Sequence, residues 1–388
     1  MPRAEIVVFN DMHPDEFPGA ASIAYSHAKF LSTRHSVSFW HTTLTQSNVT
    51  VDEDLEVRAI SVNNYIAKIT SLNMFTRLVN EFTAPVLLFK ISTHLIFNRP
   101  RIVLINQIGV RIPRTIAIVL FLLRIRVVQT FHDFGIISPR KLYPQNISAK
   151  GKIELSKNRI INSIYFIRSK VLILLTNLNF KNICISDLQA EMYRSVRVNK
   201  IDIAPNGITR CKCLVRNLSM IRPNEVLFAG RSTGKGFERI CRIVKNNPNW
   251  KLLAAGDGDL VASAKSHLSE NQFEYLGFLK PEELFKYIHQ VKFVSVLSEC
   301  FDVYPTIALE GLMHNSKILA SPSIGTTRLL GIHGGGIIID SSNTDVDLDS
   351  CFASCNYFSN EASDSISLEL TAQYYESIFR RSLSPTSK

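Results

Sequence analysis

The chain has 388 residues, of which 46% are hydrophobic and 20% charged, and its formal net charge is +11 at pH 7. This length predicts about two domains, each with its own core, and the composition excludes a disordered or fibrous protein. The longest uninterrupted apolar run, residues 116–123, is far shorter than the ~20 residues that span a bilayer. The first apolar run, residues 6–9, does not resemble a signal peptide, so we expect a cytoplasmic protein.

The excess positive charge lies in the first half of the chain. Residues 1–215 carry 27 Lys/Arg against 14 Asp/Glu, and the remainder carries 17 against 19. Residues 140–170 hold eight basic side chains and one acid, Glu154. Such a patch can attract phosphate, an anionic membrane or nucleic acid, although a solvated basic face is the plainer alternative. We expect no nucleic-acid partner, because no stacking aromatics are interleaved with these charges.

The seven cysteines are an odd number and lack paired CxxC spacing. This pattern favours neither a disulfide framework nor a zinc site, and we interpret them as reduced thiols.

Short β-rich runs alternate with helix-length amphipathic stretches, which is typical of an α/β protein with parallel sheets. The pattern predicts helices over residues 21–32 and 160–178, and strands in the first half over residues 6–9, 37–40, 101–105, 127–131 and 182–185. The second helix is predicted from an apolar stripe at three- and four-residue spacing: Ile160, Ile164, Ile167, Val171, Leu174 and Leu178. Arg168 and Lys170 fall off that stripe.

A second alternating series begins after residues 206–207. Its predicted strands cover residues 226–229, 251–255, 274–276, 293–297 and 318–320, followed by a C-terminal helix over residues 363–381. We therefore predict four segments: a first α/β domain (1–210), a second α/β domain (211–362), a C-terminal helix (363–381) and a flexible tail (382–388).

Glycines and charged side chains follow the predicted strands, where open parallel sheets bind ligands. The strand at residues 226–229 leads into Gly230-Arg231-Ser232-Thr233-Gly234-Lys235-Gly236 and then a helix. Glycines let the backbone approach an anion, and Arg231 and Lys235 supply positive charge for phosphate oxygens. This loop predicts a phosphate cradle, with an ordinary βα turn as the alternative; it lacks the Walker A spacing.

A second candidate lies at residues 298–312. Pro305 favours the first turn of a helix, which places free backbone N–H groups near Val303, Tyr304 and Thr306. A diphosphate can dock at such a terminus, and Asp302 and Glu310 can accept hydrogen bonds from ligand hydroxyls. The alternative is that Asp302 caps the helix and Glu310 makes a structural bond.

In the order of these motifs, the sequence resembles the retaining GT-B glycosyltransferases of the family-four type (glycosyl transferases group 1), which include bacterial polysaccharide and lipopolysaccharide enzymes. The resemblance rests on the Gly-Arg to Lys-Gly loop, on Gly256-Asp257-Gly258, on Leu276-Gly277 before Glu282-Glu283-Leu284, and on Asp302 to Glu310. It covers the second half almost continuously. It implies two Rossmann-like domains whose parallel sheets face a central cleft. The first domain (1–210) would bind the acceptor and the second (211–362) the nucleotide-sugar donor, and the helix over residues 363–381 would pack back toward the first domain.

The resemblance also implies roles for particular residues. Arg231 and Lys235 would bind the donor diphosphate, Glu310 the ribose hydroxyls, and Asp302 the sugar hydroxyls. The donor site would also include these residues at strand and helix ends: Gly19, Gly230, Gly256, Gly277, Phe278, Val303, Tyr304 and Thr306. In the first half, Pro18-Gly19-Ala20 resembles the family's glycine turn, and His132 its histidine at the donor sugar.

Two positions depart from the family pattern. The first acid of the acidic segment is Asp302 rather than glutamate, with Glu299 three residues upstream as a rival for its role. The usual second glycine of the first-half turn is Ala20.

The expected function is transfer of a sugar from a nucleotide-diphosphate sugar to a saccharide or lipid-linked acceptor, with retention and without a metal or other cofactor. The alternatives are a catalytically degenerate binding module, motivated by Asp302 and Ala20, and a sugar-nucleotide epimerase. A nicotinamide oxidoreductase is disfavoured because no strand leads into GxGxxG. Peripheral association of the basic first half with an anionic membrane, at the inner face of the cell membrane, is a further hypothesis.

Overall fold

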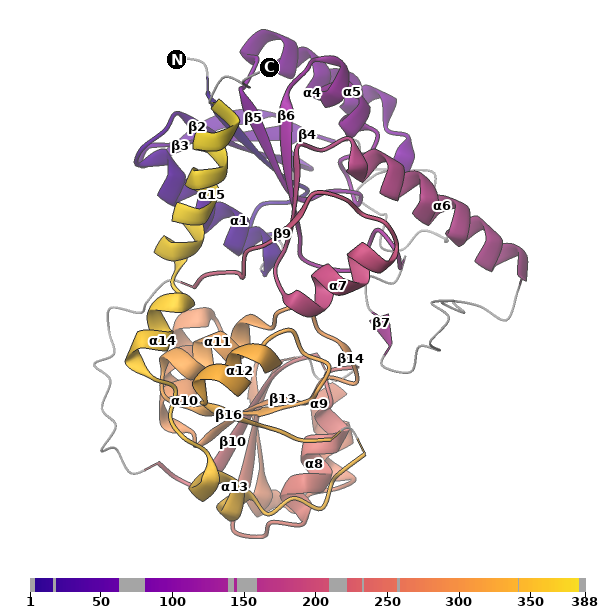
Figure 1. The fold of residues 1–388 in the computed structure, drawn as a ribbon. Helices are drawn as coiled ribbons and strands as arrows, with labels where there is room; N and C mark the ends of the chain where they lie inside the picture. The colour runs from indigo at the N-terminus through magenta and orange to yellow at the C-terminus, as the bar shows by residue number, and fades with distance from the viewer. Residues whose placement is uncertain are drawn as a thin grey trace. The chain divides into compact units, whose positions relative to one another are not determined.

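A computed structural model describes residues 4–16, 19–62, 81–138, 143–144, 159–208, 222–231, 234–256, 259–340 and 342–383. The chain forms two compact α/β units. Unit 1 comprises residues 1–141, 154–207 and 368–388, and unit 2 comprises residues 142–153 and 208–367. The last helix of the chain therefore belongs to unit 1 rather than to the unit that precedes it in sequence (Figure 1).

Unit 1 is built on an eight-stranded sheet of order β3-β4-β2-β1-β5-β6-β8-β9. All the strand pairs are parallel except the β3–β4 hairpin. The described elements are β1 (Ile6–Asn10), α1 (Ala20–Ser32), β2 (Val37–Thr43), β3 (Asn48–Asp52), β4 (Leu55–Ser61), α4 (Pro85–Asn98), β5 (Ile102–Gln107), α5 (Ile116–Leu122), β6 (Arg126–Phe131), α6 (Arg159–Asn177), β8 (Lys181–Cys184), α7 (Asp187–Ser195), β9 (Ile201–Ile203) and α15 (Leu368–Leu383).

Helices cover both faces of this sheet, so its central strands are apolar on both sides. On one face, α4 and α5 pack their inner apolar side chains against β1 and β5, and Leu172 and Leu175 of α6 lie beside Ile105. On the other face, α1 and α15 pack against the alternate residues of the same strands, with Tyr375, Ile378 and Phe379 of α15 in that core. These side chains make α15 part of the core of unit 1.

Unit 2 is built on a six-stranded parallel sheet of order β12-β11-β10-β13-β15-β16. The described elements are β7 (Tyr143–Pro144), β10 (Glu225–Gly230), α8 (Phe237–Lys245), β11 (Lys251–Gly256), α9 (Asp259–Lys265), β12 (Phe273–Gly277), α10 (Pro281–Gln290), β13 (Phe293–Val296), β14 (Cys300–Phe301), α11 (Thr306–Met313), β15 (Lys317–Ala320), α12 (Thr327–His333), β16 (Gly336–Ile338), α13 (Leu348–Ser354) and α14 (Asn360–Ser365). A short 3-10 helix, residues 270–272, precedes β12.

The two sheets confirm the predicted α/β class with mostly parallel strands. Each predicted strand overlaps an observed one. The edge strands β3, β9 and β16 and the inner strand β4 were not predicted. The predicted helix over residues 363–381 is two helices, α14 and α15. The break occurs because Ile208 pairs with this segment through its backbone: its N–H donates to the carbonyl of Ile366, and it bridges Ser367.

The helix predicted over residues 160–178 is α6, but its apolar stripe is not buried. Such a stripe normally faces the core, whereas Ile160, Ile164, Ile167, Val171 and Leu174 are 38–71% exposed. Arg168, which falls off the stripe, is 6% exposed and faces the interior of unit 1. Of the helices in the described ranges, only residues 160–177 of α6 are long and apolar enough to cross a membrane, by length and composition.

Candidate functional site

Three glycines end adjacent strands of unit 2. Gly230, Gly256 and Gly277 are the last residues of β10, β11 and β12, and Gly230 is paired with Gly256 in the sheet. Gly256 has a φ of +146°, and a Cβ there would lie 2.0 Å from the carbonyl oxygen of Gly230. Only glycine therefore fits at this position. The carboxyl edge of the sheet presents bare backbone at these strand ends.

The loop between β10 and α8 is held close to the strand that follows it in the sheet order. Gly236 has a φ of +76°, and a Cβ there would lie 1.9 Å from the carbonyl oxygen of Leu297. The carbonyl of Gly234 accepts a hydrogen bond from the N–H of Glu299 at 3.2 Å. These constraints fix the backbone on both sides of Lys235. Arg231 is exposed, and Ser232 and Thr233 lie outside the described residues.

Lys235 contacts Asp302 although the two are 67 residues apart. The Lys235 Nζ lies 2.5 Å from Asp302 Oδ2, and the buried Ser298 hydroxyl donates to the same oxygen at 3.2 Å. The Asp302 backbone is also held, because its N–H donates to Ser323 and its carbonyl accepts from Gly325. The side chains are 33% and 16% exposed, so the ammonium remains open to solvent and to an incoming anion.

Asp302 lies immediately before the N-terminus of α11. Pro305 is the N-cap residue and no described side chain caps the helix, so the first-turn amides from Thr306 onward carry the positive end of the helix dipole. Val303 and Tyr304 are buried and lead the chain into this turn. An ammonium, a guanidinium and a helix N-terminus on neighbouring segments form a site suited to phosphate oxygens.

Glu310 lies one turn into α11 and is partly buried. Its carboxylate makes no hydrogen bond or ion pair with the residues that the structure describes, and burial raises its pKa to about 7. A carboxylate with its acceptor positions free can receive hydrogen bonds from two hydroxyl groups. Phe278, directly after Gly277, is 82% exposed.

Glu299, the rival to Asp302, is exposed. The structure thus brings together Lys235, Asp302 and the start of α11 through the ends of β10 and β13, and it places Glu299 at the surface. Asp257 and Gly258 of the predicted Gly-Asp-Gly motif lie outside the described residues.

The two candidate site residues of the first half, Gly19 and His132, belong to unit 1. Gly19 is the N-cap of α1 with a φ of +92°, and Pro18 lies outside the described residues. His132 follows β6, and its Nε2 lies 3.3 Å from Oδ1 of the buried Asn106. Burial lowers the pKa of His132 to about 4, so the ring is neutral near pH 7. A neutral imidazole can accept or donate one hydrogen bond to a sugar hydroxyl.

Sequence reasoning missed the network that holds the turn after His132. The Arg168 guanidinium donates to the carbonyl of Gly135 at 2.7 Å and to both carboxylate oxygens of Glu81, and Arg114 donates to Glu81 at 2.8 Å. Tyr193 donates to the carbonyl of Asp133 at 2.8 Å. The sequence contains no clear signal for this network, because Arg168 lies off the apolar stripe that predicts the helix.

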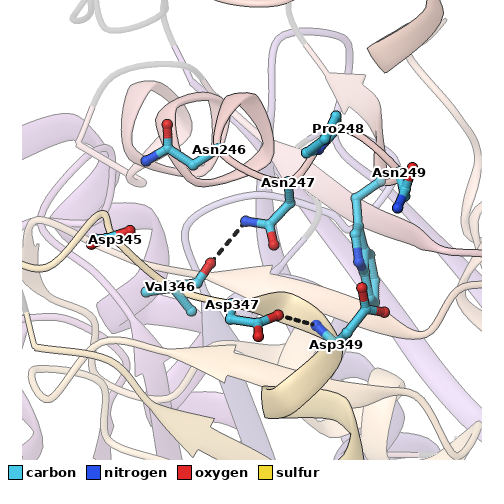
Figure 2. A pocket seen from close by; sticks show the side chains of 9 residues that line it. Asn246, Asn247, Pro248, Asn249, Asp345, Val346, Asp347 and Asp349 are labelled. Atoms are coloured by element: carbon cyan, nitrogen blue, oxygen red, sulfur yellow. Dashed lines mark hydrogen bonds between the residues drawn. The ribbon is translucent and has the colours of Figure 1, made fainter.

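A cavity of about 210 Å³ in unit 2 lies away from these residues. It is lined by the turn before β11 and by the segment before α13, where Asn247 donates to the carbonyl of Val346 and the Asp347 side chain accepts from the N–H of Asp349 (Figure 2). The turn precedes β11, so the cavity is at the amino end of that strand, opposite the edge formed by Gly230 and Gly256. In parallel sheets ligands bind at the carboxyl edge. In the described ranges, no three His, Cys, Asp or Glu side chains form a group that could hold a metal ion.

No protein-family model matches the chain. No curated protein matches it by sequence.

The structure resembles solved structures over nearly its whole length. Sucrose-phosphate synthase from Thermosynechococcus elongatus matches with a TM-score of 0.70 at 13% sequence identity, covering 98% of this chain and 99% of that one. Anabaena HepE in complex with UDP and glucose matches with a TM-score of 0.65 at 15% identity, covering 97% and 99%. An alpha,alpha-trehalose-phosphate synthase (UDP-forming) from Burkholderia xenovorans in complex with glucose-6-phosphate matches with a TM-score of 0.66 at 9% identity, covering 97% and 99%. These neighbours are glycosyltransferases of the GT-B fold, and the chain has that fold, with two Rossmann-like units of mostly parallel strands.

Proposed function

We propose that the chain is a glycosyltransferase that takes a sugar from a nucleotide-diphosphate donor. The observation that carries the proposal is the contact of Lys235 with Asp302 at the N-terminus of α11, beside Gly230 and Arg231. The structural neighbours add support, because they include complexes with UDP, UDP-glucose and glucose-6-phosphate.

In the proposed reaction, the donor diphosphate binds Arg231, Lys235 and the amides at the start of α11. Lys235 exchanges Asp302 for a phosphate oxygen, which frees Asp302 to accept a hydrogen bond from the sugar. Glu310 accepts hydrogen bonds from the ribose hydroxyls. The bond between the anomeric carbon and the diphosphate oxygen breaks, and fixed positive charge stabilises the departing nucleoside diphosphate.

The acceptor hydroxyl forms the new bond from the face that the diphosphate leaves, and its proton passes to the leaving phosphate oxygen. This course gives retention at the anomeric carbon. Because side-chain cations and a helix dipole neutralise the leaving group, the reaction requires no divalent metal or other cofactor. His132 contacts the donor sugar in its neutral form.

The finer assignments are part of the same proposal. The transferred sugar is a hexose, and the acceptor is a saccharide or a lipid-linked saccharide in the synthesis of cell-surface polysaccharide such as lipopolysaccharide or capsule. The enzyme works in the cytoplasm and associates peripherally with the anionic inner face of the cell membrane. The basic first half of the chain motivates this last assignment.

The test begins with a thermal-shift screen of nucleoside diphosphates and nucleotide sugars, since a ligand that binds only the folded state raises its melting temperature. The best ligand is then titrated against Arg231→Ala. We expect affinity to fall by about tenfold or more, because a charge-assisted contact to phosphate is lost. The matched control is Arg242→Ala, an exposed arginine on α8 paired only with Glu238 among the described residues. Turnover is followed as nucleoside diphosphate release with EDTA and with added Mn²⁺ or Mg²⁺.

Turnover that requires the metal, together with an unchanged rate for Arg231→Ala, would overturn the proposed mechanism. A degenerate module that binds nucleotide without turnover is the second candidate, motivated by the ion pair that already occupies Lys235. Steady nucleoside diphosphate release that depends on acceptor excludes it.

A further inference from the structure

The outer surface of one helical layer of unit 1 is apolar. Helices α4, α5 and α6 cover the same face of the eight-stranded sheet and lie on one flank of the unit (Figure 1). Their inner side chains form the core on that face. Large hydrophobic side chains also project from the opposite sides of all three helices. A helix that is apolar on both sides is normally buried on both sides.

The exposed side chains recur at helical spacing on α4 and α5. On α4, the exposed side chains are Val86, Phe89, Ile96 and Phe97, and on α5 they are Ile118, Phe121 and Leu122. Phe97 is 73% and Leu122 is 72% exposed, while Leu95 and Leu120 on the inner sides are fully buried. The outer residues are therefore not side chains displaced from the core. They form a second apolar face.

Helix α6 continues this face. Ile164, Phe166, Ile167, Val171 and Leu174 are exposed, whereas the buried side holds Leu172 and the ion-paired Arg168. This is the reverse of the polarity expected of a helix that faces water. We name these twelve residues of α4, α5 and α6 the outer apolar face.

Basic side chains and no acids accompany the outer apolar face. Residues 82–132 contain seven Lys/Arg and no Asp or Glu, and two of the seven, Arg111 and Arg114, are ion-paired inside unit 1. Helix α6 adds Lys170, whose ammonium lies over the Phe166 ring at 5.2 Å. Arg99 and Arg124 are exposed at the C-terminal ends of α4 and α5. Because β5 and β6 are adjacent and parallel, both arginines lie at the same edge of the sheet. The face thus combines large apolar side chains with a rim of positive charge.

We propose that the outer apolar face docks unit 1 on an anionic lipid bilayer, with its aromatic and aliphatic side chains among the acyl chains and its basic rim among the headgroups. This inference rests on the proposed membrane association and identifies the residues that would contact the membrane. The charge favours a bilayer over a second copy of the chain, because a two-fold interface would bring this acid-free basic face against itself. Interfacial helices with an apolar face and a Lys/Arg rim bind membranes in this way.

Helix α6 lies on the membrane rather than crossing it. Its length and composition would suffice for a span, but Arg168 and Ser169 hold its inner side to the core of unit 1: Arg168 pairs with Glu81, and Ser169 donates to the carbonyl of Ile137. A crossing helix would have to break the Glu81 pair and leave its charges in hydrocarbon.

The experiment is co-sedimentation of the full chain with vesicles of phosphatidylcholine alone and with phosphatidylglycerol added. We expect binding to the anionic vesicles, partial release at high salt, and little binding to the neutral ones. The variant Phe89→Ser, Phe97→Ser, Phe121→Ser and Phe166→Ser should bind the anionic vesicles at least about tenfold more weakly, because four rings no longer enter the bilayer.

The matched control is Val49→Ser with Val51→Ser, which removes two exposed hydrophobic side chains from the edge strand β3 of the same unit. It should bind like the parent chain. Melting curves show that each variant is folded, and nucleoside diphosphate affinity, carried by unit 2, should not change. If the parent chain binds vesicles but no nucleotide, that result would count against the proposed function and would leave the proposed docking surface standing.

Three results would overturn the inference. The first is a parent chain that pellets with neither type of vesicle, and the second is a control variant that loses as much binding as the four-phenylalanine variant. The third is a dimer of the parent chain, seen by light scattering, that the four-phenylalanine variant abolishes while vesicle binding persists unchanged; the face would then be an interface between two copies.

Discussion

Arg168 and Glu81 form a buried bidentate pair, with the guanidinium Nε and one terminal nitrogen each 2.6 Å from a carboxylate oxygen. Both side chains are less than 10% exposed. The same terminal nitrogen donates to the carbonyl of Gly135, three residues after His132. The pair therefore links α6 to the turn that positions a candidate catalytic histidine.

Replacing Arg168 with Met should destabilise unit 1 by about 3 kcal/mol, because Glu81 keeps only Arg114 and the carbonyl of Gly135 loses a donor. Turnover at saturating substrate should also fall, since the turn after β6 relaxes. Urea unfolding and kcat measure the two effects. Lys170→Met is the control on the same helix and should change stability by less than about 0.5 kcal/mol. Equal losses of stability and kcat in both variants would contradict a specific role of the buried pair, because any change on α6 would then have the same effect.

Asp302→Ala separates binding from transfer. Removing the carboxylate frees Lys235 from its partner at 2.5 Å, so we expect nucleoside diphosphate affinity to stay the same or to rise. Sugar transfer should fall by roughly a hundredfold, since an acceptor of sugar hydroxyl hydrogen bonds is lost. Lys235→Ala should instead weaken diphosphate binding by about tenfold or more. Calorimetry and turnover assays check both; weaker diphosphate binding by Asp302→Ala would contradict the exchange of partners at Lys235.

Gly236→Ala tests the geometry of the phosphate loop. A Cβ at 1.9 Å from the Leu297 carbonyl oxygen forces the loop away from the strand end, and the φ of +76° adds strain. We expect a loss of about 2 kcal/mol or more in the stability of unit 2 and weaker nucleotide binding. Gly277→Ala is the matched control: its φ is +74°, but nothing lies within 4 Å of the added carbon, so only about 1 kcal/mol of strain is expected. Equal effects would mean that the close approach is irrelevant.

The raised pKa of Glu310, about 7, predicts a pH dependence of binding. Only the ionised carboxylate accepts hydrogen bonds from both ribose hydroxyls, so nucleoside diphosphate affinity should rise as the pH increases through 7. In the unliganded chain the sign is opposite, because ionising a buried carboxyl makes the folded state less stable as the pH rises from 4.5 toward 7. Glu310→Gln should flatten the binding profile. A profile that survives this change would assign the titration to another group.

His27 predicts a loss of stability in acid. It is 3% exposed, its Nε2 has no hydrogen-bond partner among the described residues, and burial lowers its pKa to about 3. The unfolded chain binds a proton near pH 6.5 and the folded chain does not, so the stabilisation is complete above pH 6.5 and is lost as the pH falls toward 3. At pH 5 the loss should be about 2 kcal/mol.

The fluorescence of Trp40 reports this unfolding in a Trp250→Phe background, since the chain has two tryptophans and Trp40 is buried in unit 1. His27→Leu should reduce the acid loss between pH 7.5 and 5 by about 2 kcal/mol, and the rest of the loss comes from other buried histidines such as His132. Tyr375→Phe, which keeps the ring 5.1 Å from His27, should retain the whole loss. If His27→Leu leaves the slope unchanged, another group is responsible.

The central strands were predictable because parallel strands buried on both faces are nearly continuous apolar runs, as in Ile6–Asn10. The hairpin of β3 and β4 was not predictable, because β3 is exposed along most of its length and carries the polar residues Asn48, Thr50 and Asp52. The sequence also could not predict which side of α6 is buried, because an apolar stripe does not show which side of a helix packs against the core. The interior position of Arg168 depends on Glu81, 87 residues away.

The candidate phosphate site was predictable at the level of residue types. A short stretch of sequence suffices here, because glycines, Arg231 and Lys235 at the end of one strand together predict phosphate binding. The contact of Lys235 with Asp302 could not be read from the sequence, because it depends on β10 and β13 being neighbours in the sheet although β11 and β12 separate them along the chain. The free carboxylate of Glu310 likewise follows from the packing of α11.

The placement of α15 has a consequence for how the chain folds as it is synthesised. Unit 1 begins with the first residues, yet its core includes Tyr375, Ile378 and Phe379 from the last helix. The face of the sheet that α15 covers can therefore close only after α15 has left the ribosome. Residues 208–367 leave the exit tunnel earlier and can form the unit 2 sheet first. Unit 1 thus begins to emerge first but is completed after unit 2, and one apolar face of its sheet needs protection until α15 emerges.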